Sequence, residues 1–121
     1  MKRLLVFFYL VLLTFGGPAR IEAHAFLEQA APGVGSTVKG SPEKVSIQFT
    51  EAVEPAFSKI QVFNAAGKEV DKRDVHVDRS AQNRLQVSVP SLTPGTYTVV
   101  WRVVSVDTHV TNGKFDFVVT R

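Results

Sequence analysis

The sequence predicts an all-β fold, a single antiparallel β-sandwich with Greek-key connections. Three observations support this fold class. Apolar and polar residues alternate in several short segments beyond residue 24, turn-forming residues separate these segments, and no segment of that region has apolar residues at helical spacing. Short strands of this kind within about 100 residues are typical of a two-layer sandwich around one core.

The alternating segments place Val, Ile, Leu or Phe at every second position, with mostly polar residues between them. Turn signals separate several of the segments. Residues 64–67 are Asn-Ala-Ala-Gly, Pro94-Gly95 precedes the fifth segment, and Asn112-Gly113 precedes the sixth. We therefore expect strands near residues 45–50, 60–62, 74–78, 85–89, 97–105 and 115–119.

The longest of these segments, 97–105, is expected to be a central strand. Its odd-numbered positions from Tyr97 to Val103 form one apolar face, and its other face is also largely apolar. Trp101 lies on the first face and is expected in the core. Arg102 lies on the second face and is a candidate for an ion pair, although the sequence identifies no partner for it.

Residues 1–23 have the features of a cleaved secretory signal peptide. Lys2 and Arg3 precede an apolar run at 4–15, which is shorter than the about 20 residues of a membrane span. Cleavage after Ala23 is favoured over cleavage after Ala19, and an uncleaved anchor is the alternative. The expected organisation is a signal peptide at 1–23 and one domain at 24–121, with no stable membrane association after processing.

The composition of the region after residue 23 excludes several classes of site. It holds eleven basic and ten acidic side chains, a net charge of +1, so we infer no binding to nucleic acid. The chain has no cysteine, and its one methionine is Met1. Soft sulfur ligands select Cu(I), and the mature region has none. We also find no nucleophile–base pair and expect no enzyme.

The candidate metal ligands are His24, Asp107 and His109. After cleavage at Ala23, His24 would offer both a free amine and an imidazole, which form a chelate. In an extended chain Asp107 and His109 would point to the same side. Three nitrogens and one carboxylate suit a tetragonal Cu(II) or Ni(II) site, and the Irving–Williams order favours copper.

Other interpretations of these residues stay open on residue patterns alone. A histidine at the start of a domain is commonly a frayed terminus, and Asp-X-His after a strand is commonly a turn. Two histidines with a carboxylate also suit zinc. The third histidine, His76, lies between Asp74 and Asp78 and could imitate a second metal site; we expect this triplet to form a solvent-facing polar surface because Val75 and Val77 supply the core face.

Seven short blocks decide between these interpretations because together they resemble the CopC family of exported copper-binding proteins. The blocks span the whole region after residue 23, and the run from Gly95 through His109 is the most specific of them. They are residues 24–27, 31–33, 42–45, 49–53, 95–105, 107–109 and 113–117.

The resemblance implies a seven-stranded immunoglobulin-like sandwich and one Cu(II) ion, held by the amine and imidazole of His24, by Asp107 and by His109. It implies a protein of the periplasm that sequesters or delivers copper, with a CopD-like inner-membrane permease as a possible partner. Glu51 corresponds to an acid near the site in relatives and is a candidate to orient a ligand. Some relatives carry a methionine-rich loop for Cu(I), whereas residues 64–83 here are polar, so no Cu(I) site is expected.

Two rival functions remain at this point. An amino-terminal histidine chelate with a second histidine also resembles the copper brace of oxidative polysaccharide-cleaving enzymes, although Asp107 would fill the position where oxygen must bind. A metal-free adhesion or interaction module could use the same sandwich.

Overall fold

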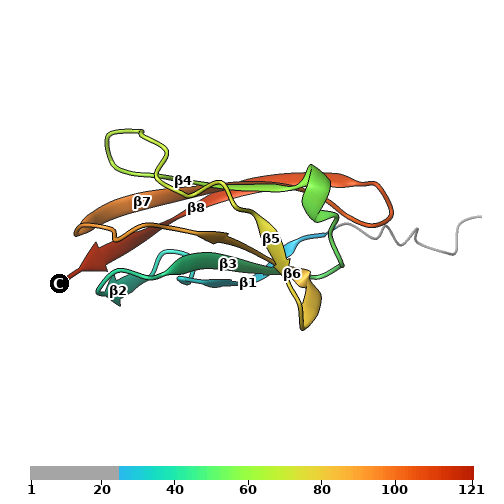
Figure 1. The fold of residues 1–121 in the computed structure, drawn as a ribbon, viewed down its shortest axis with the longest axis horizontal. Helices are drawn as coiled ribbons and strands as arrows, with labels where there is room; N and C mark the ends of the chain where they lie inside the picture. The colour runs from blue at the N-terminus through green and yellow to red at the C-terminus, as the bar shows by residue number, and fades with distance from the viewer. Residues whose placement is uncertain (1–24) are drawn as a thin grey trace, which may run out of the picture.

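The computed structural model describes residues 25–121. This part of the chain forms eight β-strands and a short 3-10 helix, arranged as two packed sheets (Figure 1). No helix within it is long and apolar enough to cross a membrane. The elements are β1 (Leu27–Ala31), β2 (Thr37–Lys39), β3 (Lys44–Phe49), η1 (Pro55–Phe57), β4 (Lys59–Phe63), β5 (His76–Asp78), β6 (Ala81–Ser88), β7 (Gly95–Val104) and β8 (Val110–Thr120).

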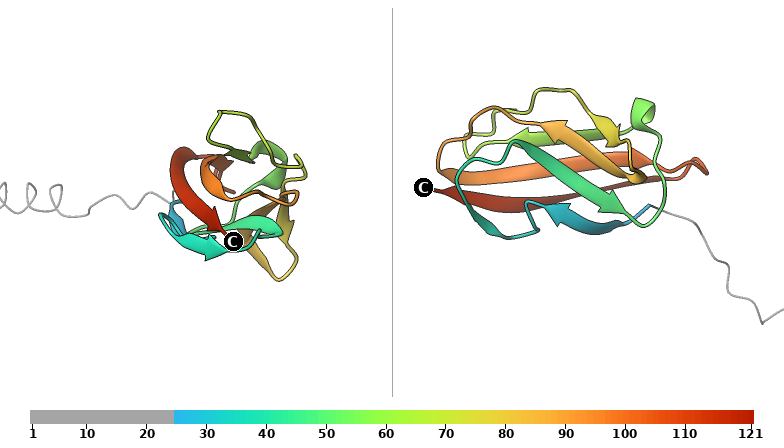
Figure 2. Two further views of the ribbon diagram at one scale, coloured as in Figure 1. Left: turned by 90° about the vertical axis from the view of Figure 1, so that its left-hand side faces the viewer. Right: turned by 60° about the horizontal axis from the view of Figure 1, so that its bottom comes forward.

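The strand order is that of an immunoglobulin-like Greek-key sandwich. One sheet has the order β1-β3-β6-β5 and the other β2-β8-β7-β4, so the chain crosses between sheets after β1, β2, β3, β4 and β6. Neighbours pair antiparallel except β2 and β8, which run parallel. The views in Figure 2 show the two layers and the long β7–β8 hairpin along one of them. The predicted all-β sandwich is confirmed.

All six predicted strands are present, and β7 lies between β4 and β8 as a central strand should. Two further strands, β1 and β2, were not predicted. β2 has three residues and is held by parallel pairing of Thr37–Lys39 with Val118–Thr120. Its strand conformation therefore depends on a distant segment and leaves no periodic pattern in the local sequence.

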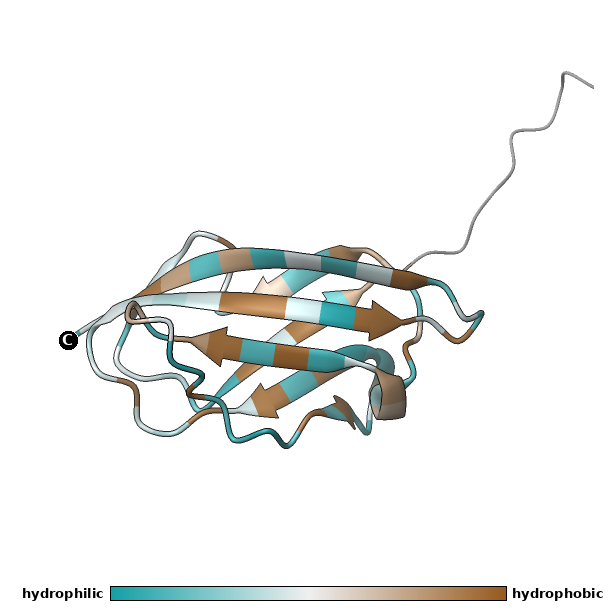
Figure 3. Cartoon of the chain, turned by 90° about the horizontal axis from the view of Figure 1, so that it is seen from above, coloured by the Kyte–Doolittle hydropathy of each residue, from teal (hydrophilic) through white to brown (hydrophobic). Residues whose placement is uncertain are grey.

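The core lies between the sheets and is made by the apolar faces that the alternation predicted. Figure 3 shows hydrophobic and hydrophilic residues alternating along the strands. The side chains of Ile47, Phe49, Val99 and Val103 are fully buried, and the Phe49 ring meets Trp101 edge-on with 5.1 Å between ring centroids. The expectation that Trp101 is a core residue is confirmed.

The start of β7 is fixed by a tyrosine corner. The Tyr97 hydroxyl donates a hydrogen bond of 2.6 Å to the Thr93 carbonyl, and its ring stacks on Phe117 with 5.5 Å between centroids. A tyrosine bonded to the backbone a few residues upstream is a feature of immunoglobulin-like sandwiches. The corner fixes one end of the hairpin whose other end carries the candidate site.

The Asn112-Gly113 pair does not form the predicted turn and lies inside β8, so that prediction is wrong. Gly113 pairs with Trp101 across the ladder, and a Cβ at Gly113 would lie 2.7 Å from the indole Cζ2. The glycine therefore makes room for the indole ring and does not provide a turn conformation. The turn itself lies at residues 105–109.

We predict that Gly113→Ala lowers the free energy of unfolding by about 1–3 kcal/mol, because the added methyl group must displace the indole of Trp101. Urea unfolding followed by the fluorescence of this single tryptophan measures the effect. Gly33→Ala is the matched control: its Cβ would find no atom closer than 3.7 Å, so we expect a change within about 0.5 kcal/mol. Equal stabilities of the two variants would contradict the close contact.

Candidate metal centre

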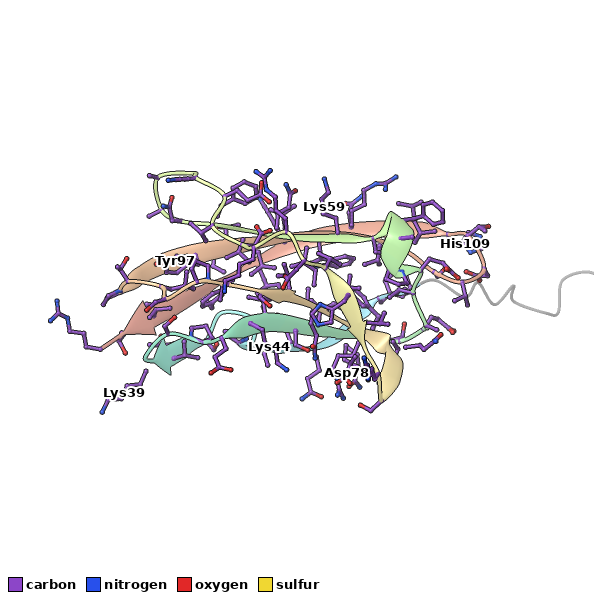
Figure 4. The ribbon with its side chains drawn as sticks, in the orientation of Figure 1. Lys39, Lys44, Lys59, Asp78, Tyr97 and His109 are labelled. Carbon is purple, nitrogen blue, oxygen red and sulfur yellow. The ribbon has the colours of Figure 1, made fainter. Side chains whose placement is uncertain are left out.

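The turn that joins β7 to β8 carries two of the predicted metal ligands. Val104 pairs with Val110 as the last rung of the ladder, and Asp107 and His109 lie between them. This turn lies at the end of the sandwich that also holds η1 and the start of the described chain (Figures 1 and 4). The fold thus brings residues from both ends of the domain sequence to one region.

The backbone here forms a tight turn and not the extended chain that the sequence analysis assumed. Thr108 has a φ of 71°, in the left-handed region. Its N–H donates to the Ser105 carbonyl at 2.8 Å, and the Ser105 N–H donates to the His109 carbonyl at 2.9 Å. The assumption of alternating directions is wrong, yet the turn brings the two predicted side chains to each other.

A buried hydroxyl organises this turn. Ser105 is fully buried, and its Oγ donates a short hydrogen bond to the Asp107 carboxylate. The same Oγ accepts the N–H of His109 at 3.2 Å. No motif in the sequence pointed to this role for Ser105. The available signal was a hydroxyl residue that ends the apolar face of the central strand.

Asp107 and His109 form a pair that is open to solvent. Asp107 Oδ2 lies 3.3 Å from His109 Nδ1, and the side chains are 37% and 48% exposed respectively. The hydrogen bond from Ser105 holds the pKa of Asp107 below its ordinary value; His109 adds to this shift, against the opposing effect of partial desolvation. The carboxylate is therefore kept ionised, which is the state in which it binds a metal.

The distance between these two groups fits a shared metal ion. Adjacent ligands about 2.0–2.2 Å from one ion lie about 3 Å apart, close to the 3.3 Å between Asp107 Oδ2 and His109 Nδ1. Within residues 25–121, no group of three or more His, Cys, Asp or Glu side chains gathers in a way that could hold a metal. The predicted ligand His24 lies outside the described residues.

The first described residues are anchored beside this turn. Ala25 is fully buried, and its carbonyl accepts a hydrogen bond from the hydroxyl of Thr111, two residues after His109. The next residue, Phe26, exchanges hydrogen bonds with Thr50: its carbonyl accepts the Thr50 N–H at 2.9 Å and its N–H donates to Thr50 Oγ1 at 3.0 Å. The chain is therefore fixed near His109 at the residue that follows His24.

Glu51, the candidate orienting residue, lies close to the turn along the backbone. The carbonyl of its neighbour Ala52 accepts the Val106 N–H at 3.1 Å, and Val53 forms a β-bridge with Ser105. Glu51 itself is half-buried, and in the described part of the chain no hydrogen bond or ion pair joins its carboxylate to the turn. Its role in orienting a ligand stays a prediction.

The His76 triplet is a polar surface, as expected. His76 is exposed, and its Nδ1 lies 2.7 Å from the Asp74 carbonyl oxygen, while Asp74 Oδ1 accepts the Ser88 N–H at 2.8 Å. Hydrogen bonds from Ser80, and then from Arg84, lower the pKa of Asp78 to about 2. Each acid thus has a structural partner of its own.

We predict that Ser105→Ala raises the pKa of Asp107 toward its ordinary value, because the serine hydroxyl is the largest cause of the lowered pKa. Carboxyl-carbon NMR titration of the metal-free protein measures it. Thr108→Ala is the matched control, since the Thr108 hydroxyl donates to the Asp107 main-chain carbonyl and not to the carboxylate. A pKa that stays unchanged in Ser105→Ala, or rises equally in both variants, would contradict the assigned role.

Comparison with known proteins gives a consistent assignment. A model of the CopC domain matches residues 27–120. Protein YobA of Escherichia coli K12 is 36% identical over 100 residues, which cover 80% of this chain and 79% of that protein. The crystal structure of CopC from Methylosinus trichosporium OB3b superposes with a TM-score of 0.75 at 35% identity, covering 79% of this chain and 93% of that one. PcoC, described as a methionine-rich copper resistance protein from Escherichia coli, superposes with a TM-score of 0.72 at 30% identity, covering 81% of this chain and all of its own. With its sandwich, its β7–β8 turn and these matches, the chain belongs to the CopC domain family.

Proposed function

We propose that this chain is an exported copper-binding protein of copper homeostasis that holds one Cu(II) ion at its processed amino terminus. The observation that carries the proposal is the ionised Asp107 beside His109, half exposed and positioned by Ser105 next to the anchored Ala25. The copper-related function of a relative such as PcoC supports the same assignment.

The proposed ligands are the amine and imidazole of His24, the carboxylate of Asp107 and the imidazole of His109. Ala25 is bonded to His24 and tied to Thr111, so the chelate begins one residue from a fixed point beside His109. Cleavage after Ala23 creates the amine. Three nitrogens and one oxygen then suit the tetragonal preference of Cu(II).

The oxidation state follows from the ligands that the chain supplies. The sequence has no cysteine and no methionine after Met1. Thioether and thiolate ligands select Cu(I), and PcoC, the relative described as methionine-rich, differs from this chain in that respect. The proposal is therefore one Cu(II) site and no Cu(I) site.

The same proposal places the protein in the periplasm after removal of residues 1–23. There it sequesters the ion or delivers it, and a CopD-like inner-membrane permease is a candidate recipient. Glu51 is proposed to orient a ligand from the segment that is hydrogen-bonded to the turn.

Binding, and not catalysis, is the role that these residues favour. In a copper-brace enzyme an equatorial position must be open to oxygen, whereas here Asp107 lies beside His109 where it would occupy that position. Consumption of oxygen or peroxide by the copper-loaded protein with a reductant would contradict this part of the proposal. A metal-free adhesion module, the other rival, requires that loss of His24 and His109 leave function intact.

We predict that His24→Ala, Asp107→Ala and His109→Ala each weaken Cu(II) binding by at least about tenfold, the usual effect of removing one group that binds or supports a metal. Competitive titration against a chromophoric chelator measures the affinity. His76→Ala is the matched control: this histidine is exposed and lies on the other sheet, so its affinity should equal that of the wild type. A loss in His76→Ala equal to that in His109→Ala would contradict the proposed site.

The amine ligand makes a separate prediction about processing. Mass spectrometry of the exported protein should find a chain that begins at His24, and a recombinant form with one glycine added before His24 should bind Cu(II) less tightly because its amine is displaced from the imidazole. A mature chain that begins at Arg20 or Ala25 would exclude the proposed amine ligand.

We also predict that Cu(II) affinity falls by more than about tenfold per pH unit below pH 6. Imidazoles have an ordinary pKa of about 6.5 and α-amines of about 7.7–8.0, so more than one proton competes with the ion in that range. Titrations at pH 7, 6 and 5 measure the slope. A loss of Cu(II) affinity of less than about tenfold per pH unit, which corresponds to fewer than one competing proton, would contradict a site with three nitrogen ligands.

A further inference from the structure

Three cationic side chains form a row on the outer face of the β4-β7-β8 sheet. Lys59 on β4 is directly opposite Arg102 on β7. Lys114 on β8 pairs with Val100, which places it diagonally next to Arg102. All three are exposed. Figure 4 shows Lys59 on the side of β4 that faces away from the other sheet.

These charges are not neutralised by other residues in the part of the chain that the structure describes. In residues 25–121 no ion pair or hydrogen bond joins the charged groups of Lys59, Arg102 or Lys114 to another residue. The next outward-facing acid on β8, Asp116, accepts the hydroxyl of Thr98 at 2.8 Å. Like charges directly opposite each other destabilise a sheet. The row therefore has a cost that a bound anion would remove.

The row lines a groove of about 720 Å³. Val100 contributes apolar floor, no acidic residue of the described chain lines the groove, and Phe57 of η1 also lines it with 67% of its surface exposed. Phe57 is the most exposed large hydrophobic side chain among the described residues. The groove thus combines unneutralised positive charge with an accessible aromatic ring.

The groove is joined to the end of the sandwich that holds the candidate metal centre. Ser58, next to Phe57, accepts the Val104 N–H through its Oγ at 3.1 Å, and the Glu54 N–H donates to the Val104 carbonyl at 2.8 Å. Val104 directly precedes the turn with Asp107 and His109. A molecule in the groove would therefore lie on the same hairpin as the proposed copper ligands.

We propose that this groove binds an acidic segment of a partner protein, with one or more apolar side chains of the segment against Phe57. A small anion would use the cations alone and leave the aromatic ring exposed, whereas a peptide segment matches both features. The segment carries carboxylates at a spacing that reaches Lys59, Arg102 and Lys114. None of these residues is a proposed copper ligand. The peptide-binding proposal and the copper-binding proposal can therefore be tested independently.

The test uses the mature protein labelled with ¹⁵N and a capped peptide of glutamates and aspartates around a central leucine pair. Binding should shift the amide signals of β4, β7 and β8 around the groove and weaken steeply with added salt. The combined variant Lys59→Gln, Arg102→Gln and Lys114→Gln should bind the peptide at least about tenfold more weakly, since three surface ion pairs are lost. Adding Phe57→Ala to this triple variant should weaken peptide binding further.

The matched control removes three exposed lysines elsewhere, Lys39→Gln, Lys44→Gln and Lys72→Gln, so it has the same net charge as the first triple variant. It should bind the peptide within about twofold of wild type. Cu(II) affinity should be unchanged in both triple variants. Equal losses in the two variants, or equal binding of a peptide with serines in place of the leucines, would overturn the proposal. Inorganic phosphate or anionic vesicles that occupy the groove while the peptide does not would also overturn it.

Discussion

The antiparallel ladder between β7 and β8 is the interaction on which the rest of the structure depends. It runs from Gly95↔Val119 to Val104↔Val110 without a break in register. Because successive side chains alternate between faces, this ladder supplies core residues inward, Arg102 and Lys114 of the cationic row outward, and the turn with the candidate metal ligands at its tip. The tyrosine corner fixes its other end. One hairpin therefore sets the relative positions of core, groove and candidate metal centre.

Ser105 connects the core to the candidate site. A polar group with no solvent access must find partners within the protein, and Ser105 finds them in the Asp107 carboxylate and the His109 N–H. The satisfaction of one buried hydroxyl thus fixes two exposed groups. For the proposed copper site, this arrangement means that the carboxylate and imidazole are positioned in the metal-free protein, so that less ordering would be required on binding.

The two proposed sites use different chemistry at neighbouring places. The end of the sandwich offers nitrogen and oxygen ligands at metal-binding distance, whereas the outer sheet face offers charge and an aromatic ring. η1 lies between them, and the residues on either side of it, Glu54 and Ser58, are hydrogen-bonded to Val104. Under the two proposals, the surface that recognises a partner protein lies beside the copper ion. The family assignment does not depend on either site.

The sequence by itself determined the two-residue alternation, and with it six of the eight strands, the sandwich, the buried face of Trp101 and the candidate pair Asp107 and His109. These follow from local periodicity and from residue chemistry. Only the tertiary structure decided the roles of β2, Gly113 and Thr111, because each depends on a partner far along the chain or across the ladder. The role of Ser105 depends on the tight turn that brings Asp107 and His109 to its buried hydroxyl. It also decided that a left-handed Thr108, and not an extended chain, brings Asp107 to His109. Alternation specifies which face a residue occupies, but contacts between segments specify what it meets there.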